Sequence, residues 1–496
     1  MSRPLSSPPA PLLTSLALSL LLAGCMVGPD HVRPALGAGE SFLRDETVNG
    51  PAAAGAVAAA DAEVLFWRRF DDPLLTRLVE DALRANHDLR IGLARLDQAR
   101  ALARQGDLDL VPTITAQAGA ADARASADQA PGLARGDRDS ESVEVGVRAA
   151  WELDFFGRVR RGAQAQRSEA EAAASDLGAL QVVVAAEVAQ AYFDLRGRQA
   201  QLAVAGHNAD NQASSLDLVT ARLDAGQGTE FDTERARAQL ESTRARIPAL
   251  RAEEAILMHR IAVLTGHQPG TLIEELEAVR ALPVLSDPVA AGAPGDLLRR
   301  RPDIAAAEAR LASATARIGV ETADLFPRFT LGGLIGSQAM DAGNLFERDS
   351  ETRLVALGVD WSFLDVGRVR ARIAAAEAGA EAALARYEQT VLRALEETES
   401  ALVRYQHART ELAHLEHAAE AGSSGARLAR LRFEGGLVDF LDVIDAERAR
   451  LEAQDRLAQG QARTANAMVS VYRALAGGWP DRLPDRVDLA SARRSP

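Results

Sequence analysis

The chain contains no lysine and a single cysteine, Cys25, and Phe, Trp and Tyr make up only 4% of its residues. The absence of lysine excludes phosphate-loop lysines, Schiff-base lysines and lysine general bases. One cysteine allows neither an internal disulfide nor a zinc site made of several cysteines. The sequence also has no phosphate loop and no nucleophile elbow. We therefore expect no catalytic site, no resident metal and no cofactor.

The charge balance is acidic, with 70 Asp and Glu residues against 56 basic residues, all of them Arg. A net charge of -14 argues against nucleic acid as a partner, because neutralising phosphates requires a basic surface. His407, Glu411 and His414 share a predicted helix face, and His417 lies nearby in the sequence. Their spacing differs from the His-Glu-x-x-His zinc arrangement, so we interpret them as a solvated face.

The N-terminus has the form of a bacterial export signal. Arg3 precedes the apolar run Leu12–Leu22, which at about eleven residues is too short to span a bilayer. The run ends in the sequence LAGC, whose cysteine is Cys25, and this resembles a bacterial lipobox. The resemblance implies cleavage before Cys25 and acylation of the new N-terminus, and Met26 fits sorting to the outer membrane. The alternative is a plain secretory signal with an incidental cysteine.

A ten-residue motif occurs twice in the chain. Trp151–Arg160 reads WELDFFGRVR, and Trp361–Arg370 reads WSFLDVGRVR about 210 residues later. The same offset relates Glu187 to Glu397, Arg222 to Arg432 and Gly226 to Gly436. A fixed offset over such a length indicates an internal duplication. We therefore expect two copies of one unit, rather than the three domains that length alone suggests.

Each copy contains two segments in which apolar and polar residues alternate. The four segments are Pro112–Gly119, Val143–Leu153, Arg328–Ile335 and Val355–Phe363. Alternation with a period of two predicts strands with one apolar and one wet face. A run of about ten residues suits a tilted membrane-spanning strand, and Trp151 and Trp361 stand where an interfacial aromatic girdle belongs. The alternative is a pair of ordinary hairpins on a soluble core.

Long Ala-rich segments follow each motif and predict helices. We expect helices over about Asp72–Asp107, Arg158–Ala225, Thr229–Thr265, Asp303–Asp324 and Arg368–Glu434, and a return helix that ends at Leu475. The two longest would extend for roughly 100 Å at 1.5 Å per residue. Pro248 predicts a kink or a local break in its helix, since it lacks the backbone donor.

The expected organisation divides the chain into six parts. They are a signal peptide (1–24), a lipidated N-terminal tether (25–66), the first repeat (67–265), a linker or equatorial region (266–301), the second repeat (302–477) and a flexible C-terminal tail (478–496).

Four amphipathic strands cannot cross a membrane as an isolated sheet, because the sheet edges would leave backbone groups unpaired in lipid. Four strands are also too few to close a barrel, for which about eight is the usual minimum. The chain must therefore oligomerise, and two to four copies would supply eight to sixteen strands. The pattern predicts an α+β membrane protein, in which an oligomeric transmembrane β-barrel is continued by a long α-helical barrel.

Several motifs together resemble the outer-membrane factor family of tripartite efflux systems, of the TolC and OprM type. They are the lipobox followed by MVGPDHVRP, the pair Phe66-Trp67, the sequence DPLL from Asp72, the duplicated motif and Phe440–Ala446. The resemblance covers nearly the whole mature chain. It implies a homotrimer with a twelve-stranded barrel, a periplasmic adaptor and an inner-membrane pump as partners, location in the outer membrane of a Gram-negative bacterium, and no catalysis.

The resemblance also implies a gate at the far tip of the helical hairpins. In the family, aspartates and in some members a leucine narrow the entrance. Carried over, Asp442 and Asp445 form carboxylate rings and Leu441 forms an apolar ring. Close like charges repel and favour bound cations. The alternative is a helix N-terminus decorated with acids.

The first repeat contributes its own residues to this tip. Phe231 and Asp232 match Leu441 and Asp442, and Arg235 matches Asp445, with which it could pair. Phe433 stands where some members of the family use a tyrosine for tip hydrogen bonds. Phenylalanine cannot form such a bond, so the sequence does not identify the contact that closes this tip.

The function implied is the passive exit duct of an efflux pump for small molecules or drugs. A first alternative is the outer-membrane component of a type I protein secretion system. A second alternative is a soluble coiled-coil scaffold, against which the strands and the lipobox argue.

Overall fold

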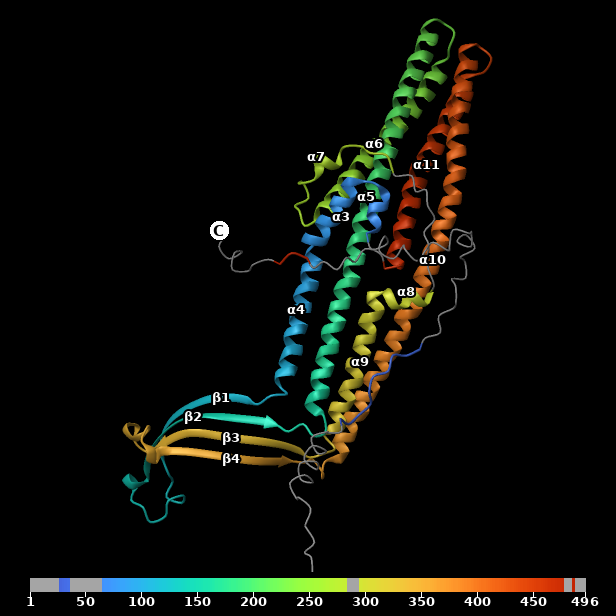
Figure 1. Ribbon diagram of the computed structural model, residues 1–496. Coiled ribbons are helices and arrows are strands. Elements are labelled where there is room, and N and C mark those ends of the chain that lie inside the picture. Colours follow the sequence, from blue (N-terminus) through green and yellow to red (C-terminus); the bar gives the residue numbers. More distant parts are fainter. Residues whose placement is uncertain (1–25, 36–64, 283–293, 477–483, 487–496) are drawn as a thin grey trace, which may run out of the picture. The chain divides into compact units, whose positions relative to one another are not determined.

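The computed structural model describes residues 26–35, 65–282, 294–476 and 484–486, and Figure 1 labels its elements. These residues fold as two compact units. Unit 1 holds residues 26–35, 96–173 and 306–388, and unit 2 holds the remaining described residues. Cys25, the signal segment, most of the expected tether and most of the expected tail lie outside the described residues.

Unit 1 contains one four-stranded sheet, whose strands lie side by side in Figure 1. The strands are β1 (Thr113–Arg124), β2 (Asp139–Glu152), β3 (Arg328–Ala339) and β4 (Glu351–Asp360). Their order is β1-β2-β3-β4 and every pairing is antiparallel. All four predicted strands are confirmed, and the β2–β3 pairing joins the two repeats.

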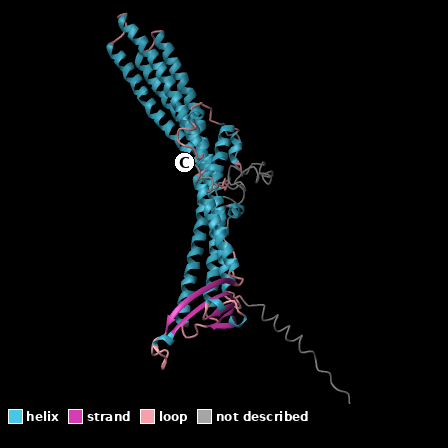
Figure 2. Ribbon diagram, turned by 90° about the vertical axis from the view of Figure 1, so that its left-hand side faces the viewer, coloured by secondary structure: helices cyan, strands magenta, loops and turns pink. Residues whose placement is uncertain are grey.

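Helices make up most of the remainder of both repeats, and Figure 2 colours them cyan and the strands magenta. The first repeat has α3 (Pro73–Ala85), α4 (His87–Leu108), α5 (Arg158–Asp224) and α6 (Glu230–Leu264). The second has α9 (Pro302–Ala323), α10 (Val366–Glu434) and α11 (Phe440–Ala474). Two short helices, α7 (Ile273–Leu276) and α8 (Pro294–Arg300), lie in the predicted linker.

Two helix predictions differ from the structure. The helix predicted from Asp72 to Asp107 is divided at Asn86, because Asn86 caps α4 through Oδ1, which accepts from the backbone N–H groups of Asp88 and Leu89. At Pro248 a kink or a local break was predicted; the break is absent, since α6 continues through this residue, and the kink stays a prediction. The start of the first helix is confirmed, since Asp72 Oδ1 accepts from the N–H of Leu74 at 2.9 Å and Pro73 occupies the first position.

Aromatic side chains pack together in the core of unit 2. A 3-10 helix, η2 (Phe66–Phe70), places Phe66 and Trp67 fully inside, where Phe66 stacks on Tyr472 with ring centroids 5.0 Å apart. Phe70 packs on Phe193 at 4.7 Å. The remaining helix contacts are made largely by buried Ala, Leu and Val, as the composition suggested.

Within the described residues, α5 is the one helix that is long and apolar enough to cross a membrane. More than half of its most apolar segment is buried inside the chain. This burial is typical of a core helix, so its hydropathy does not indicate a membrane span.

Candidate functional site

The two faces of the sheet differ in polarity. On one face, Trp151 pairs with Leu331, which pairs with Leu357. Several side chains of this face are exposed: Ile114, Val147, Trp151, Leu331, Ile335, Val355, Leu357 and Val359. The opposite face carries mainly polar residues, among them Thr115, Gln117, Glu144, Arg148, Glu152 and Thr330. An exposed apolar face on both repeats indicates contact with lipid rather than with a soluble core.

The two girdle tryptophans make the same contact. The indole Nε1 of Trp151 donates to the carbonyl of Leu110 at 3.0 Å, and that of Trp361 donates to the carbonyl of Leu325 at 3.0 Å. Both rings remain partly exposed, at 37% and 52%. Trp361 lies just beyond the end of β4, whereas Trp151 lies within β2. The indole bond ties each helix-to-strand loop to its sheet.

The duplicated motif turns the chain from strand into helix. In the first copy, Gly157 adopts a positive φ of 83°, which favours glycine. The carboxylate of Asp154 accepts from the backbone N–H groups of Val159 and Arg160, so it caps the start of α5. Arg158 binds Glu152 through two hydrogen bonds of 2.9 and 2.5 Å.

The chain segment before the first repeat is bound to unit 1. We call residues 26–34 the strap. Arg161, only 1% exposed, donates to the carbonyls of Val27 and Gly28 and pairs with Asp30 at 2.8 Å. Gly28 lies against α9 so closely that a Cβ there would be 2.4 Å from the Cα of Gly319.

The strap fixes the residue that follows the predicted lipidation site. Val27 donates its N–H to the carbonyl of Phe156 at 3.1 Å, and Met26 lies against Gly157. Arg33 pairs with Glu308 of α9 at 3.1 Å. Sequence reasoning missed Arg161, although it directly follows the motif, because only the folded chain brings it to the strap.

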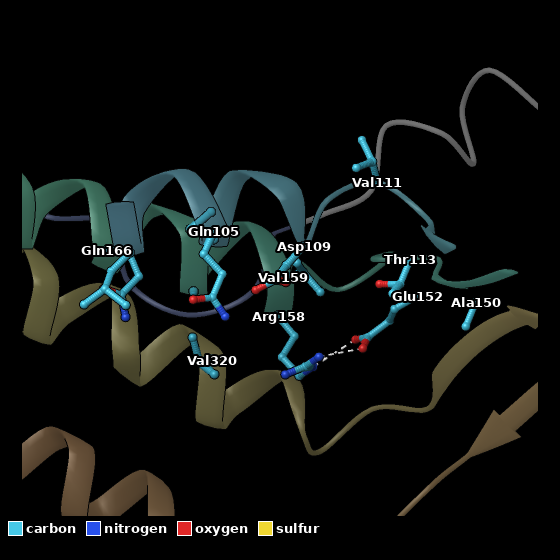
Figure 3. Close-up of a pocket in the computed structure, with 14 residues that line it drawn as sticks. Gln105, Asp109, Val111, Thr113, Ala150, Glu152, Arg158, Val159, Gln166 and Val320 are labelled. Atoms are coloured by element: carbon cyan, nitrogen blue, oxygen red, sulfur yellow. Dashed lines mark hydrogen bonds and ion pairs between the residues drawn. The ribbon is translucent and has the colours of Figure 1, made fainter. Parts of the chain in front are cut away.

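A cavity of about 490 Å³ lies where β1 and β2 meet α4 and α5 (Figure 3). The ion pair of Arg158 and Glu152 forms part of its wall, and this hydrogen bond raises the pKa of Arg158. Thr113 and Ala150 are register partners, and together with Glu152 they belong to the polar face of the sheet. The cavity therefore lies on the side of the sheet opposite to the exposed apolar side chains.

The predicted gate residues lie at the ends of the two helical hairpins of unit 2. Leu441, Asp442 and Asp445 are exposed on the first turns of α11. Phe231 is 67% exposed at the start of α6. Because Asp442 and Asp445 are exposed, cations can reach both carboxylates. Their arrangement as rings around the axis of an oligomer stays a prediction.

Phe433 has a different role from a hydrogen-bonding tyrosine. It is buried in an apolar cluster with Phe440, Val443, Ile444, Val219 and Ala236, which joins the two hairpins of one chain. The guanidinium of Arg222 lies over the Phe433 ring, 4.6 Å from its centroid. Apolar packing and a cation–π contact thus hold the hairpin ends together.

Three charged tip residues have partners within their own hairpins. The Arg235 guanidinium lies over the Phe231 ring at 5.2 Å, and Asp445 pairs with Arg448 at 3.3 Å. Asp232 accepts a hydrogen bond of 2.6 Å from the hydroxyl of Thr229, which in turn caps α6. Within one chain, the structure brings Arg235 to Phe231, and the pairing of Arg235 with Asp445 stays a prediction.

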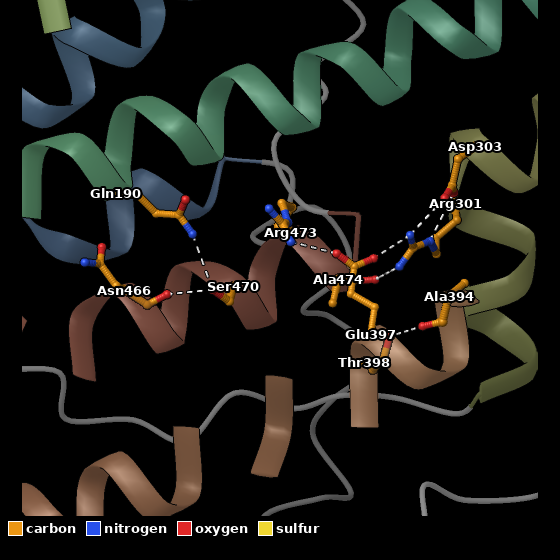
Figure 4. Close-up of polar contacts among 10 residues, drawn as sticks. All are labelled: Gln190, Arg301, Asp303, Ala394, Glu397, Thr398, Asn466, Ser470, Arg473 and Ala474. Carbon is orange, nitrogen blue, oxygen red and sulfur yellow. Dashed lines mark hydrogen bonds and ion pairs between the residues drawn. The ribbon is translucent and has the colours of Figure 1, made fainter. Parts of the chain in front are cut away.

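A polar network around the buried Arg301 joins α9, α10 and α11 in unit 2 (Figure 4). Arg301 donates to the carbonyl of Ala474 at 2.8 Å and pairs with Asp303 and Glu397. Burial lowers the pKa of Arg301, but the two carboxylates outweigh it, so the pKa is raised. Arg473 binds the same Glu397 at 2.8 Å.

A buried acid lies nearer the tip. Glu447 is 4% exposed and accepts from the hydroxyl of Ser215 at 3.2 Å. Burial raises its pKa, against the opposing influence of Arg450, Ser215 and Arg430. In the described part of the chain, no group of three or more His, Cys, Asp or Glu residues could hold a metal ion. Glu411, considered above with the histidines, pairs with Arg463.

A sequence profile described as outer membrane efflux protein matches residues 78–267 and 293–477. The chain is similar to outer membrane protein OprJ of Pseudomonas aeruginosa, with 32% identity over 95% of this chain and 96% of the relative. Its fold resembles that of the outer-membrane channel OprN, with a TM-score of 0.82, 40% identity and coverage of 92% and 100%. It also resembles the open state of the MtrE outer membrane channel of Neisseria gonorrhoeae, with a TM-score of 0.81, 26% identity and coverage of 92% and 99%. These matches favour a channel over a soluble scaffold.

Proposed function

This chain belongs to the outer membrane efflux protein family, and we propose that three copies of it form the exit duct of a tripartite pump. It is an efflux channel of the outer membrane. In the proposed assembly, a periplasmic adaptor and an inner-membrane transporter deliver small molecules to the duct. The transporter supplies the energy, and this chain conducts passively.

The observation that carries the proposal is the sheet with two different faces and two free edges. Strands β1 and β4 each have a single neighbour among the described strands. Because every pairing is antiparallel, β4 of one copy runs opposite to β1, so the two can pair between copies without changing the pattern. Closure removes the unpaired edges that lipid would not tolerate. Three copies supply twelve strands, with the apolar face outward and the polar face toward the duct.

The proposed gate lies at the hairpin tips. In a trimer, Leu441, Asp442 and Asp445 would each occur three times around the axis. The carboxylates would attract cations and exclude anions, while the Phe433 cluster would hold each pair of hairpins together. Asp232 and Phe231 of the first repeat would contribute to the same constriction.

The position of the strap favours a second membrane anchor, which is the lipid proposed on Cys25. It ends at Met26, beside the turn between β2 and α5, where the sheet would leave the lipid. An acylated Cys25 would therefore reach the periplasmic leaflet directly. Mass spectrometry of the mature N-terminal peptide tests this, and an unmodified Cys25 would refute it.

Reconstitution tests the duct itself. The purified protein should insert into planar bilayers as a stable channel, and native mass spectrometry should find three copies. Extraction from membranes should require detergent. Release by salt alone, together with the absence of conductance, would show that the chain is not a membrane channel.

A further inference from the structure

The cavity of Figure 3 is bordered by one face of each of two helices. Helix α4 contributes Leu102, Gln105, Gly106 and Asp109. Helix α5 contributes Val159, Gly162, Ala163 and Gln166 with the same spacing of three, one and three residues. Residues at this spacing share a single face of a helix. The cavity therefore lies between two facing helix surfaces, and β1 and β2 border it at the end of these helices.

Glycines on these two faces leave space for a ligand. A Cβ added at Gly106 would lie 3.3 Å from the Cα of Ala163, so α4 and α5 approach each other closely at this point. A Cβ added at Gly162 would meet no atom within 4 Å, so Gly162 borders empty space. The volume of about 490 Å³ lies within the range of small-molecule sites, which is about 300–1,000 Å³.

The cavity contains one carboxylate in excess. Its charged lining residues are Asp109, Glu152 and Arg158. Arg158 pairs with Glu152 at 2.5 Å, so these two charges cancel. Asp109 is exposed, and among the described residues its side chain has neither a hydrogen-bond partner nor an ion-pair partner. Its negative charge is therefore available to a ligand.

The charged groups around the cavity do not supply the missing cation. Asp107, on the neighbouring turn of α4, pairs with Arg167 at 2.6 Å, and Asp154 pairs with Arg160 at 3.2 Å. Arg104 precedes Asp109 by five residues, which is about 140° around the helix, and it does not line the cavity. At the end of α9 the ion pairs are also balanced, with Glu321, Asp324, Arg328 and Arg372.

The side chains of the cavity suit a molecule with a cationic group and an apolar body. Gln105 and Asp109 are four residues apart on α4, so an amide oxygen and a carboxylate lie next to each other. An ammonium group has three donors and no acceptor, and such a pair of oxygens can bind it. The aliphatic lining residues are Leu102, Val111, Val159, Ala163 and Val320.

The position of the cavity gives molecules in the proposed duct access to it. Thr113 pairs with Ala150 in the sheet, and Glu152 lies on the same face, two residues further along β2. Ile114 and Trp151 point to the opposite face and are exposed. In the proposed assembly the polar face borders the lumen, so the cavity does too.

We propose that this cavity binds cationic amphiphilic cargo inside the duct. The cationic group would donate charge-assisted hydrogen bonds to the carboxylate of Asp109 and a further bond to the amide oxygen of Gln105. The apolar body would lie against the aliphatic side chains. A trimer would have three such sites where the strands meet the helices. This inference rests on the proposed duct, because the cavity must border a conducting lumen.

Planar bilayer recording of the full-length channel tests the inference, with 1-naphthylmethylammonium as the probe. The alcohol 1-naphthalenemethanol keeps the ring without the charge, and methylammonium keeps the charge without the ring. We expect the probe to block wild-type current at a concentration about tenfold lower than either of them. Asp109→Asn should raise the blocking concentration of the probe about tenfold and leave that of the alcohol unchanged.

Two further variants make the test specific. Asp128→Asn is the matched control, because it removes the same charge from an exposed residue in the loop between β1 and β2, at the other end of β1 from Thr113. It should leave the block unchanged. Gly162→Leu keeps Asp109 and extends a side chain into the empty space, so it should weaken the block by the probe and by the alcohol alike. It also covers the case in which Asp109→Asn does not assemble.

The outcomes separate the cavity from the duct. Block by methylammonium or by the alcohol at the same concentration as the probe would overturn the proposed site. An unchanged block in assembled Asp109→Asn or Gly162→Leu would overturn it as well, while the conductance of these channels still supports the duct. No conductance from the wild type would instead contradict the duct itself.

Discussion

The indole Nε1 of Trp151 donates to the carbonyl of Leu110, and at the equivalent place in the second repeat Trp361 donates to the carbonyl of Leu325, both at 3.0 Å. In each repeat, the indole N–H of the girdle tryptophan thus bonds to a loop of the same chain. Its ring remains available to the membrane interface. The duplication has preserved a contact that links a helix end to a strand end.

This contact predicts how the two tryptophans contribute to stability. Trp151→Phe keeps an aromatic ring but leaves the Leu110 carbonyl without its donor. We expect a loss of about 1 kcal/mol in the free energy of unfolding, and a similar loss for Trp361→Phe. Denaturant unfolding in detergent, followed by circular dichroism, measures both. Full stability in either variant would mean that water replaces the indole without cost.

The apolar sheet face is predicted to contact lipid. Val147→Arg or Leu357→Arg should cost about 2–4 kcal/mol per chain near the bilayer midplane and reduce the yield of assembled trimer. On the opposite face, Glu144→Arg and Gly358→Ser should be tolerated. A Cβ at Gly358 has its nearest neighbour at 3.7 Å, an ordinary contact. Gel filtration after membrane extraction measures assembly, and equal tolerance on both faces would contradict the barrel.

The ends of α6 and α11 are held by different residues. Asn86 donates to the carbonyl of Leu264 at 2.9 Å, whereas Arg301 donates to that of Ala474 and also binds Asp303 and Glu397. Asn86→Ala should cost about 1–2 kcal/mol. Arg301→Gln should cost about 2–3 kcal/mol, less than a fully buried pair because Arg473 still neutralises Glu397. Thermal unfolding of both variants tests this order, in which Arg301→Gln loses more stability than Asn86→Ala.

Glu447 predicts a pH dependence of the region near the tip. Burial raises its pKa above the unfolded value of 4.5, so the folded state prefers the neutral acid. The stabilising contribution of Glu447 is therefore complete below pH 4.5 and is lost as the pH rises through the folded pKa. Glu447→Gln should be more stable than wild type at neutral pH, and the difference should shrink as the pH falls. Hydrogen exchange of the α11 amides at several pH values measures this, and a constant difference would refute it.

The last prediction concerns the acids at the tip. Asp442→Ala combined with Asp445→Ala should raise single-channel conductance and weaken cation preference, because the carboxylate rings no longer hold cations. Divalent cations on the periplasmic side should block the wild type more than the variant. Glu434→Ala is a suitable control, since this exposed acid lies on α10 before the turn. Unchanged conductance, selectivity and block would identify Asp442 and Asp445 as ordinary surface acids.

The local pattern of the sequence determined the elements of this protein and their repetition. Strand alternation around Trp151 and Trp361 and the Ala-rich helical runs follow from periodicity, which every short segment carries by itself. The cap at Asp72 was predictable for the same reason. The division at Asn86 was not, because its amide also bonds Leu264, a residue distant in sequence.

Only the tertiary structure decided which distant residues meet. Arg161 at the strap, Arg222 over Phe433, and Arg301 between Asp303 and Glu397 all depend on packing between segments far apart in the chain. Periodicity shows which face of a helix is polar, but the partner of that face is chosen by the free energy of the whole packed unit.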